Sequence, residues 1–330
     1  MKQLVLGVDG GGTKSHLALF GLDGVCAAAF ACGPLNHEVM EGGFQELETR
    51  LRESLRTVLD RAGAETGDIA YAVLGLAGVD TAAQHRSISA MLREAGLADF
   101  TLCNDAFLGV MAGCPGGVGI CAINGTGTTI AAIDRAGTAV QVGGLGGITD
   151  DRGGGGWYAA QTVAAVYREL YKNGPRTALR ESLFAALGVT RREDYIETLT
   201  GGMPDGVWDK INRLVFAAAD AGDAAALDIL ARSAEHFAGA IAHLAGELDF
   251  PADETLSVTL AGSVFVRQTV RILPRMVERR VREITGRAAD FLLLEVPPVA
   301  GAVLHAARRA GREIGPEAVR AGLAERLSAG

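Results

Sequence analysis

Two short glycine-rich segments are the strongest candidates in the sequence for binding a ligand. One is residues 9–14 (DGGGTK) and the other is residues 124–128 (NGTGT). Glycine lets several backbone N–H groups converge on one point because no Cβ stands in the way, and converging N–H groups hold phosphate. Both segments are therefore candidate phosphate-binding loops. The candidate residues are Gly11, Gly12, Thr13 and Lys14 in the first loop, and Gly125, Thr126, Gly127 and Thr128 in the second.

The first loop can be compared with three kinds of phosphate-binding loop. A Rossmann loop needs glycine at position 15, where Ser15 stands, followed by a helix. A Walker A loop needs lysine directly after its second glycine, but Thr13 follows Gly12. The segment instead resembles the phosphate hairpin of the sugar-kinase and actin superfamily, in which an Asp and a glycine turn join two strands. A flexible turn without a ligand is the alternative for either loop taken alone.

Apolar runs on both sides of each loop predict the strands that hold it. Residues 4–8 and 15–22 flank the first loop, and residues 118–123 and 129–133 flank the second. The order of strand, glycine loop, strand and Asp-containing turn therefore occurs twice. This repetition favours two related halves, with chance similarity as the alternative.

The rest of the chain alternates between helical and strand-like patterns. Helical spacing of apolar residues marks 44–63 and 266–284, and apolar runs predict strands at 69–76, 100–103, 255–260 and 291–296. Such alternation indicates the α/β class. We place a boundary in the stretch 113–117, which gives an N-terminal lobe over residues 1–115 and a C-terminal lobe over residues 116–330.

Composition and charge exclude several classes of protein. The 330 residues are 48 % apolar, enough for a sizeable core, and the net charge of −8 argues against general nucleic-acid binding. No uninterrupted apolar run approaches the about 18 residues of a membrane span, and no signal-peptide pattern fits the start. Five cysteines without C-x-x-C spacing favour reduced thiols in the cytoplasm over disulfides or a metal cluster.

Five segments together resemble one family. The chain is similar to the N-acetylglucosamine kinases of the family that also contains the BadF/BadG-type ATPases. The segments are residues 7–14 (GVDGGGTK), 33–37 (GPLNH), 104–106 (NDA), 124–128 (NGTGT) and 143–157 (GGLGGITDDRGGGGW). The resemblance implies two ribonuclease-H-like lobes of the actin-like ATPase superfamily with an interdomain cleft, and a closing helix that packs back on the N-terminal lobe.

The resemblance also implies roles for two carboxylates. Asp105 matches the family's catalytic Asp, and a carboxylate there would orient a sugar hydroxyl and take its proton late in phosphoryl transfer. Without the resemblance, an Asp that caps the next helix is the simpler interpretation. Asp9 would hold Mg²⁺ through water, because Mg²⁺ gives up its waters reluctantly. Lys14 either adds positive charge near the phosphates or is a solvated surface lysine.

Further residues are implied to bind the two substrates. Asn36, Asn104, Asp105 and Asp151 would contact the sugar, and Gly262 and Ser263 would contact the adenosine of ATP. An ordinary strand-to-helix turn is an equal interpretation of Gly262 and Ser263. In the segment around Asp151, the chain departs from the family pattern: Asp150, Arg152 and Gly154 replace Gly, Glu and Ser. The choice between acetylated and free glucosamine therefore stays open.

The resemblance thus implies an ATP- and Mg²⁺-dependent kinase that phosphorylates N-acetylglucosamine or glucosamine at the 6-hydroxyl, working as a homodimer in the cytoplasm. The alternative is an ATPase that activates a radical dehydratase or reductase through an iron–sulfur cluster. That alternative needs suitably spaced cysteines after the second loop, whereas Cys121 falls inside a predicted strand. A sugar-sensing repressor would need a DNA-binding segment before the first strand, and we expect neither nucleic acid nor membrane as a partner.

Overall fold

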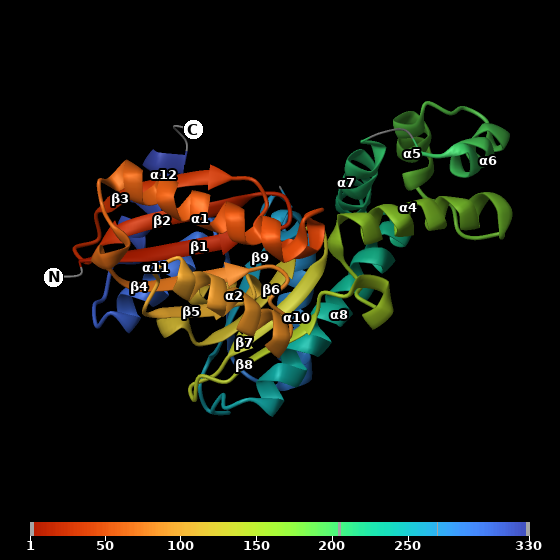
Figure 1. Cartoon of the computed structure of the whole chain (residues 1–330). Coiled ribbons are helices and arrows are strands. Elements are labelled where there is room, and N and C mark those ends of the chain that lie inside the picture. Colours follow the sequence, from red (N-terminus) through yellow and green to blue (C-terminus); the bar gives the residue numbers. More distant parts are fainter. Residues whose placement is uncertain (1–2, 204–205, 269, 328–330) are drawn as a thin grey trace. The chain divides into compact units, whose positions relative to one another are not determined.

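The computed structural model describes residues 3–203, 206–268 and 270–327 (Figure 1). It divides into two compact units. Unit 1 comprises the described residues up to Cys121, together with Ala131–Ala139 and those from Leu294 onward. Unit 2 comprises Ala122–Ile130 and Val140–Leu293. Each unit is therefore built from segments that are not continuous in the sequence.

Unit 1 contains a mixed five-stranded sheet in the order β3-β2-β1-β4-β5. β1 pairs with β2 in antiparallel fashion and with β4 in parallel fashion, and β4 and β5 are also parallel. The strands are β1 (Leu4–Gly10), β2 (Ser15–Gly21), β3 (Cys26–Cys32), β4 (Ile69–Leu76) and β5 (Phe100–Cys103). The carboxyl ends of β1, β4 and β5 consequently share one edge of the sheet.

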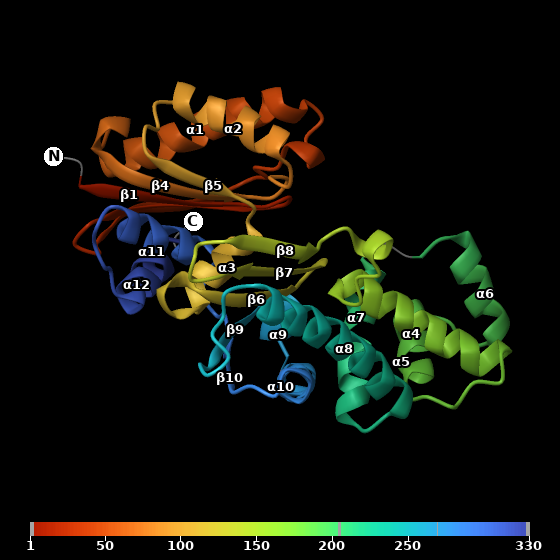
Figure 2. The ribbon, with the colours of Figure 1, turned by 90° about the horizontal axis from the view of Figure 1, so that it is seen from below.

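Helices cover both faces of this sheet, as Figure 2 shows. α1 (Gly43–Ala62) and α2 (Ala82–Glu94) lie on one face. The opposite face carries α3 (Ala106–Gly113), α11 (Val299–Arg309) and α12 (Pro316–Leu327). α11 approaches β1 closely at Gly7, where an added Cβ would lie 2.7 Å from Val303 Cγ2. The last helices of the chain therefore complete the packing of its first strands.

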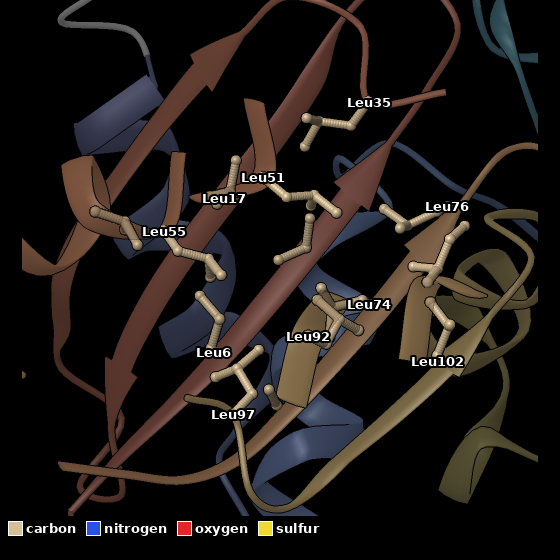
Figure 3. Close-up of a cluster of buried hydrophobic side chains, with 14 of the residues drawn as sticks. Leu6, Leu17, Leu35, Leu51, Leu55, Leu74, Leu76, Leu92, Leu97 and Leu102 are labelled. Atoms are coloured by element: carbon tan, nitrogen blue, oxygen red, sulfur yellow. The ribbon is translucent and has the colours of Figure 1, made fainter. Parts of the chain in front are cut away.

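The core between the sheet and α1 and α2 is mainly leucine (Figure 3). α1 contributes Leu47, Leu51 and Leu55, whose spacing of four residues places them on one helix face. They pack against strand residues such as Leu6 and Leu17, which are fully buried. The amphipathic pattern predicted for residues 44–63 is thereby confirmed as α1.

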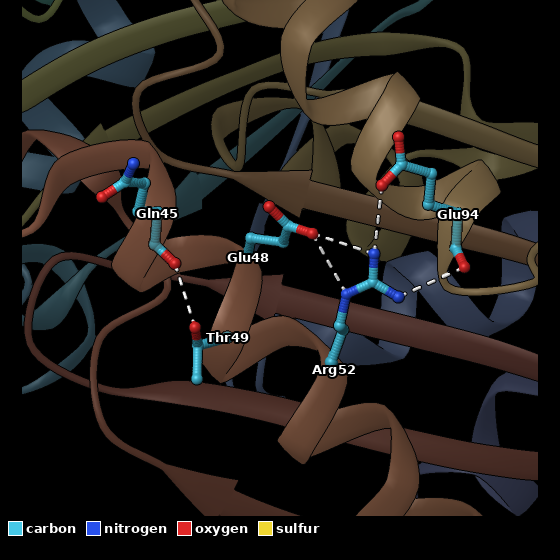
Figure 4. A network of polar contacts seen from close by, with 5 residues as sticks. All are labelled: Gln45, Glu48, Thr49, Arg52 and Glu94. Carbon is cyan, nitrogen blue, oxygen red and sulfur yellow. Dashed lines mark hydrogen bonds and ion pairs between the residues drawn. The ribbon is translucent and has the colours of Figure 1, made fainter.

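A polar network outside this core joins α1 to α2 (Figure 4). Arg52 of α1 donates to Glu48 Oε1 one turn earlier, at 2.9 Å from Nη2. It also donates to the side chain and the backbone carbonyl of Glu94 at the end of α2, both at 3.2 Å. These exposed contacts connect α1 to the end of α2 but each adds little to stability.

The second sheet has the order β10-β9-β6-β7-β8. Its strands are β6 (Gly119–Asn124), β7 (Thr128–Ile133), β8 (Ala139–Gly143), β9 (Leu256–Ala261) and β10 (Ala289–Leu293). The helices of unit 2 are α4 (Gly154–Tyr171), α5 (Leu179–Leu187), α6 (Arg192–Gly201), α7 (Val207–Asp220), α8 (Ala224–Glu247), α9 (Ser263–Val266) and α10 (Ile272–Thr285). The α/β class predicted from the alternating patterns is confirmed.

One predicted helix is wrong in its extent. The apolar spacing over residues 266–284 suggested a continuous helix, but α9 ends at Val266 and α10 begins at Ile272. Pro274 explains the later start, because proline lacks an N–H and is tolerated only in the first turn of a helix. Across the described residues, no helix has the length and apolar character needed to cross a membrane.

Candidate active site

Parallel pairing brings three carboxylates to one edge of the sheet in unit 1. Asp9 of β1 is in register with Gly75 of β4, and Gly75 is in register with Cys103 of β5. Asp105 follows β5 by two residues, and Asp80 lies in the segment that follows β4. Burial, together with the negative charges of Asp9 and Asp80, raises the pKa of Asp105 to about 7. Residues far apart in the sequence thus form one acidic cluster.

Asp105 stands at the start of α3 without capping it. Its side chain makes no capping hydrogen bond to the helix. The side chain of Asn104 takes that place, since its Oδ1 accepts a hydrogen bond of 2.9 Å from the Ala106 N–H. A carboxylate whose pKa lies near neutrality changes protonation where a general base must act. The geometry therefore favours a chemical task for Asp105 over helix capping.

Asp9 lies opposite His16 in the antiparallel pair of β1 and β2. His16 Nδ1 is 3.6 Å from Asp9 Oδ2, and both side chains are less than one fifth exposed. Mg²⁺ in nucleotide sites typically binds one or two carboxylates, several waters and substrate phosphates. A single carboxylate beside a phosphate loop fits that donor set, although the described part of the chain has no group of three or more ionisable metal ligands.

The first glycine-rich loop, a candidate for phosphate binding, is the exposed turn between β1 and β2. Gly10 pairs with Ser15, so residues 11–14 connect the strands directly. The Asn36 side chain lies beside this turn, because an added Cβ on Gly12 would be 3.8 Å from Asn36 Nδ2. Asn36 Oδ1 accepts a 2.9 Å hydrogen bond from the Glu38 N–H, and the residue is 7 % exposed. The structure thus brings Asn36 next to the loop.

The second glycine-rich loop, the other candidate for phosphate binding, is hydrogen-bonded to the start of α4 in unit 2. The Asn124 side chain donates to the Tyr158 hydroxyl at 2.9 Å and accepts from the Gly154 N–H at 2.8 Å. The Gly155 N–H donates to the Gly125 carbonyl at 2.9 Å. The loop backbone between β6 and β7 is therefore held by the first turn of α4.

Two glycines are required for this packing. Gly154 has φ +78°, and an added Cβ would collide with the carbonyl oxygen of Thr126. Gly262, at the end of β9, has φ +91°, and an added Cβ would collide with the backbone of Asn124. Gly262 was predicted to contact adenosine. In unit 2 its immediate neighbour is Asn124, at the start of the second glycine-rich loop.

A cavity of about 620 Å³ opens beside this loop within unit 2. Its size is in the range of small-molecule sites. Gly125 and Thr126 line it together with Ser263, which joins the predicted phosphate and adenosine residues in one place. The other lining residues include Asp209, Asn212, Arg213 and Phe216 of α7, and Arg267 and Gln268 after α9.

Sequence reasoning missed the contribution of α7. No motif marks this helix, and only the three- and four-residue spacing of Asp209, Asn212, Arg213 and Phe216 hinted at a common face. Gly127 is not among the residues that line the cavity. Thr128 lies in β7 and is 3 % exposed, with its Oγ1 buried and without a hydrogen-bond partner among the described residues.

Asp151 uses its carboxylate within its own loop. Oδ2 accepts hydrogen bonds from the N–H groups of Gly144 and Gly146, at 3.0 and 2.8 Å, and Oδ1 accepts from Thr149 Oγ1 at 3.0 Å. Beside it, Arg152 forms an exposed ion pair of 2.7 Å with Asp150. The positive charge of Arg152 is therefore offset by the negative charge of Asp150. The sequence alone did not show this pairing.

Together, these features define an α/β protein with two mixed five-stranded sheets and a glycine-rich turn in each of them. The chain belongs to the BadF/BadG/BcrA/BcrD ATPase family, which matches residues 6–306. The expected family resemblance is thus confirmed over nearly the whole chain.

Two curated relatives and one solved structure illustrate this similarity. The chain is 27 % identical to an N-acetylmuramic acid/N-acetylglucosamine kinase from Clostridium acetobutylicum, over 70 % of this chain and 75 % of the relative. It is 24 % identical to an N-acetyl-D-glucosamine kinase from Dictyostelium discoideum, over 92 % and 98 % of the two chains. A crystal structure of a proposed N-acetylglucosamine kinase from Chromobacterium violaceum shares the fold, with a TM-score of 0.63 and 22 % identity over 92 % and 98 % of the chains.

Proposed function

We propose that this protein is an ATP-dependent kinase that phosphorylates an amino sugar, N-acetylglucosamine or glucosamine, at the 6-hydroxyl. The main support for the proposal is the position of Asp105, a partly buried carboxylate near Asp9 and Asp80 whose pKa is raised to about 7. Membership of an ATPase family indicates that the nucleotide is ATP. The two curated relatives are named as kinases of N-acetylated amino sugars.

In this proposal Asp105 is the general base. Its carboxylate accepts a hydrogen bond from the sugar hydroxyl and orients it. It takes the hydroxyl proton as the new O–P bond to the γ-phosphorus forms and the bond from that phosphorus to the bridging oxygen breaks, which releases ADP. A base whose pKa is near 7 is ionised in about half of the molecules at neutral pH and still retains driving force for proton transfer. Asn36 and Asn104, whose amides both donate and accept, bind neighbouring sugar hydroxyls.

The nucleotide is assigned to the glycine loops and to the cavity of unit 2. The backbone of Gly125, Thr126 and Gly127 faces phosphate, Thr128 supports the loop, and Gly262 and Ser263 lie at the adenosine end. The N–H groups of Gly11, Gly12 and Thr13, with the Lys14 ammonium, bind phosphate in unit 1. Mg²⁺ held by Asp9 through water would supply charge neutralisation for the transferring phosphoryl group.

Among the proposed sugar-contact residues, Asp151 also has a structural role in its own loop. Its carboxylate already accepts three hydrogen bonds that order residues 144–149. A carboxylate offers about four acceptor positions, so one remains for a sugar hydroxyl. We propose that Asp151 both shapes its loop and contacts the sugar.

The decisive experiment measures ADP release from ATP and Mg²⁺ with a panel of sugars: N-acetylglucosamine, glucosamine, N-acetylmuramic acid and glucose. We expect stimulation by an amino sugar and a 6-phosphate product. In the Asp105→Asn variant, kcat should fall by about 10²–10⁴-fold, the usual contribution of a general base, while ADP binding persists. Full activity of that variant would remove Asp105 from the mechanism.

The same preparation distinguishes the alternative function. An activating ATPase would bind an iron–sulfur cluster and hydrolyse ATP without sugar. In this structure Cys121 is fully buried inside β6. The homodimer, the cytoplasmic location and the Mg²⁺ requirement stay predictions of the family resemblance. Light scattering of the purified protein, fractionation of its native cells, and ADP release after Mg²⁺ chelation test them.

A further inference from the structure

Asp80 lies where the turn after β4 enters α2, and local hydrogen bonds hold its backbone. Thr81 and Gln84 form a capping box at the start of α2. The Gln84 Oε1 atom also accepts a 3.1 Å hydrogen bond from the Asp80 N–H. A capping box fixes the first turn of a helix and the residues just before it. The Asp80 carboxylate is therefore presented from a defined piece of backbone.

This carboxylate contacts the side chain of Asn104. Asn104 Nδ2 donates to Asp80 Oδ1 at 2.9 Å, while Asn104 Oδ1 accepts from the Ala106 N–H at 2.9 Å. The two contacts lie at opposite ends of one planar amide, and Asn104 is 7 % exposed. Reversing the amide would place oxygen against the carboxylate and nitrogen against an N–H. The orientation of the Asn104 amide is therefore determined by its partners.

The remaining hydrogen-bonding capacity of Asn104 is well defined. An amide side chain has two N–H donors and two acceptor lone pairs. Asp80 uses one donor and Ala106 uses one lone pair, so one donor and one lone pair are left on a fixed group. Two adjacent sugar hydroxyls, one accepting and one donating, match that pair.

We propose that Asp80 is a positioning residue: it holds the Asn104 amide so that Asn104 recognises a pair of vicinal hydroxyls on the sugar next to Asp105. The inference rests on the proposed kinase function and assigns Asp80 no direct contact with substrate. Asp80 is separated from Asn104 by 24 positions in the sequence, and parallel pairing of β4 and β5 brings them together.

The experiment compares steady-state kinetics of Asp80→Ala and Asp80→Asn with those of the wild type. The Ala variant loses the acceptor for Asn104, and we expect KM for the sugar to rise by about 10-fold, typical of a lost charge-assisted hydrogen bond. KM for ATP should be unchanged. The Asn variant keeps an oxygen for Asn104 and should recover most of the sugar affinity. Glu53→Ala, which removes an exposed carboxylate from α1 in the same unit, serves as the control.

A double-mutant cycle with Asn104→Ala tests whether Asp80 acts through Asn104. If it does, the double variant Asp80→Ala/Asn104→Ala binds sugar no more weakly than Asn104→Ala alone. Additive losses in KM, or an Asp80→Ala variant with wild-type KM, would overturn the inference while leaving the kinase proposal intact. If the wild type neither binds nor phosphorylates any sugar of the panel, the proposed function fails and this inference fails with it.

Discussion

At the scale of single residues, the acidic cluster of unit 1 is unfavourable for stability. Asp105 is removed from water and lies within the influence of Asp9 and Asp80, and all three effects oppose its ionisation. The nearby backbone N–H groups of Ala106 and Asp105 offset only part of this increase in the pKa. A cluster that costs folding energy and serves no packing purpose indicates a functional site.

The pH dependence of stability provides a test at this scale. The pKa of Asp105 is about 7 in the folded protein against 3.8 for the unperturbed group. The folded state therefore keeps the Asp105 proton to a higher pH than the unfolded state does. Folding stability is consequently lost as the pH rises from about 4 to 7. Asp105→Asn cannot ionise. Its melting temperature should exceed that of the wild type by a margin that widens as the pH rises from 5 to 7, by an amount worth up to about 3 kcal/mol, and then stays constant to pH 8.

Thermal melts of the wild type, Asp105→Asn and the surface control Glu53→Gln between pH 5 and pH 8 measure this effect. The control should follow the wild type throughout. A constant gap between Asp105→Asn and the wild type across the pH range would show that Asp105 is ionised at pH 5, contrary to the raised pKa.

The sequence predicted the members of the site better than their contacts. Asp9, Asn104 and Asp105 stand next to recognisable loops or in a short motif, so family resemblance identified them. Asp80 has no motif of its own, because its role arises from the register between β4 and β5. The offset of Arg152 by Asp150 likewise depends on a turn in which Asp150 adopts φ +55°. Local sequence patterns contain neither kind of information.

At the scale of elements, close helix packing in unit 1 depends on Gly301. An added Cβ on Gly301 of α11 would lie 2.7 Å from the Ala112 backbone nitrogen and would collide with the Leu108 carbonyl oxygen. Both contacts are to the backbone of α3, so a side chain at position 301 must push the helices apart. Gly239 of α8 is also helical, but an added Cβ there meets nothing within 4 Å.

We therefore expect opposite effects from the same substitution. Gly301→Ala should destabilise the protein by about 1–3 kcal/mol, as overpacking typically does. Gly239→Ala should stabilise it by up to about 1 kcal/mol, because alanine favours helix over glycine. Urea unfolding of both variants measures the two changes. A stable Gly301→Ala variant would mean that α11 and α3 are not in tight contact.

Elements with strong local patterns were predictable, and elements that depend on neighbours were not. The strands beside both glycine loops and the helix α1 were expected from apolar runs and helical spacing. β3 was not expected: its sequence CAAAFAC is mostly alanine, and pairing with β2 rather than propensity makes it a strand. In the predicted helix over residues 266–284, the apolar spacing continued through Pro274, which fits the first turn of α10 but not the interior of one continuous helix.

At the scale of the whole molecule, the order of the chain differs from the order of its compact units. The described residues from Leu294 onward belong to unit 1 with the first strands, while residues 140–293 belong to unit 2. Short-range sequence patterns do not predict that the last segment of the chain joins the first strands, because α11 packs against β1, which lies nearly 300 positions earlier. Most of the proposed contacts also divide between the units: the cavity assigned to the nucleotide lies in unit 2, and Asn36, Asn104 and Asp105 lie in unit 1. The first glycine-rich loop of unit 1 and Asp151 of unit 2 are the exceptions.

This division predicts that nucleotide and sugar binding can be lost separately. Gly154→Ala places a Cβ against the second glycine-rich loop at φ +78°, so it should abolish the rise in melting temperature that ADP causes by binding the folded state. The rise caused by the sugar should remain. Gly188→Ala is the matched control, because Gly188 has φ +70° with nothing within 4 Å and shares only the cost of the left-handed backbone. Asn36→Ala should show the converse, a normal response to ADP with a weakened response to sugar. Loss of both responses in Gly154→Ala, with Gly188→Ala unaffected, would mean that the two binding functions are not independent.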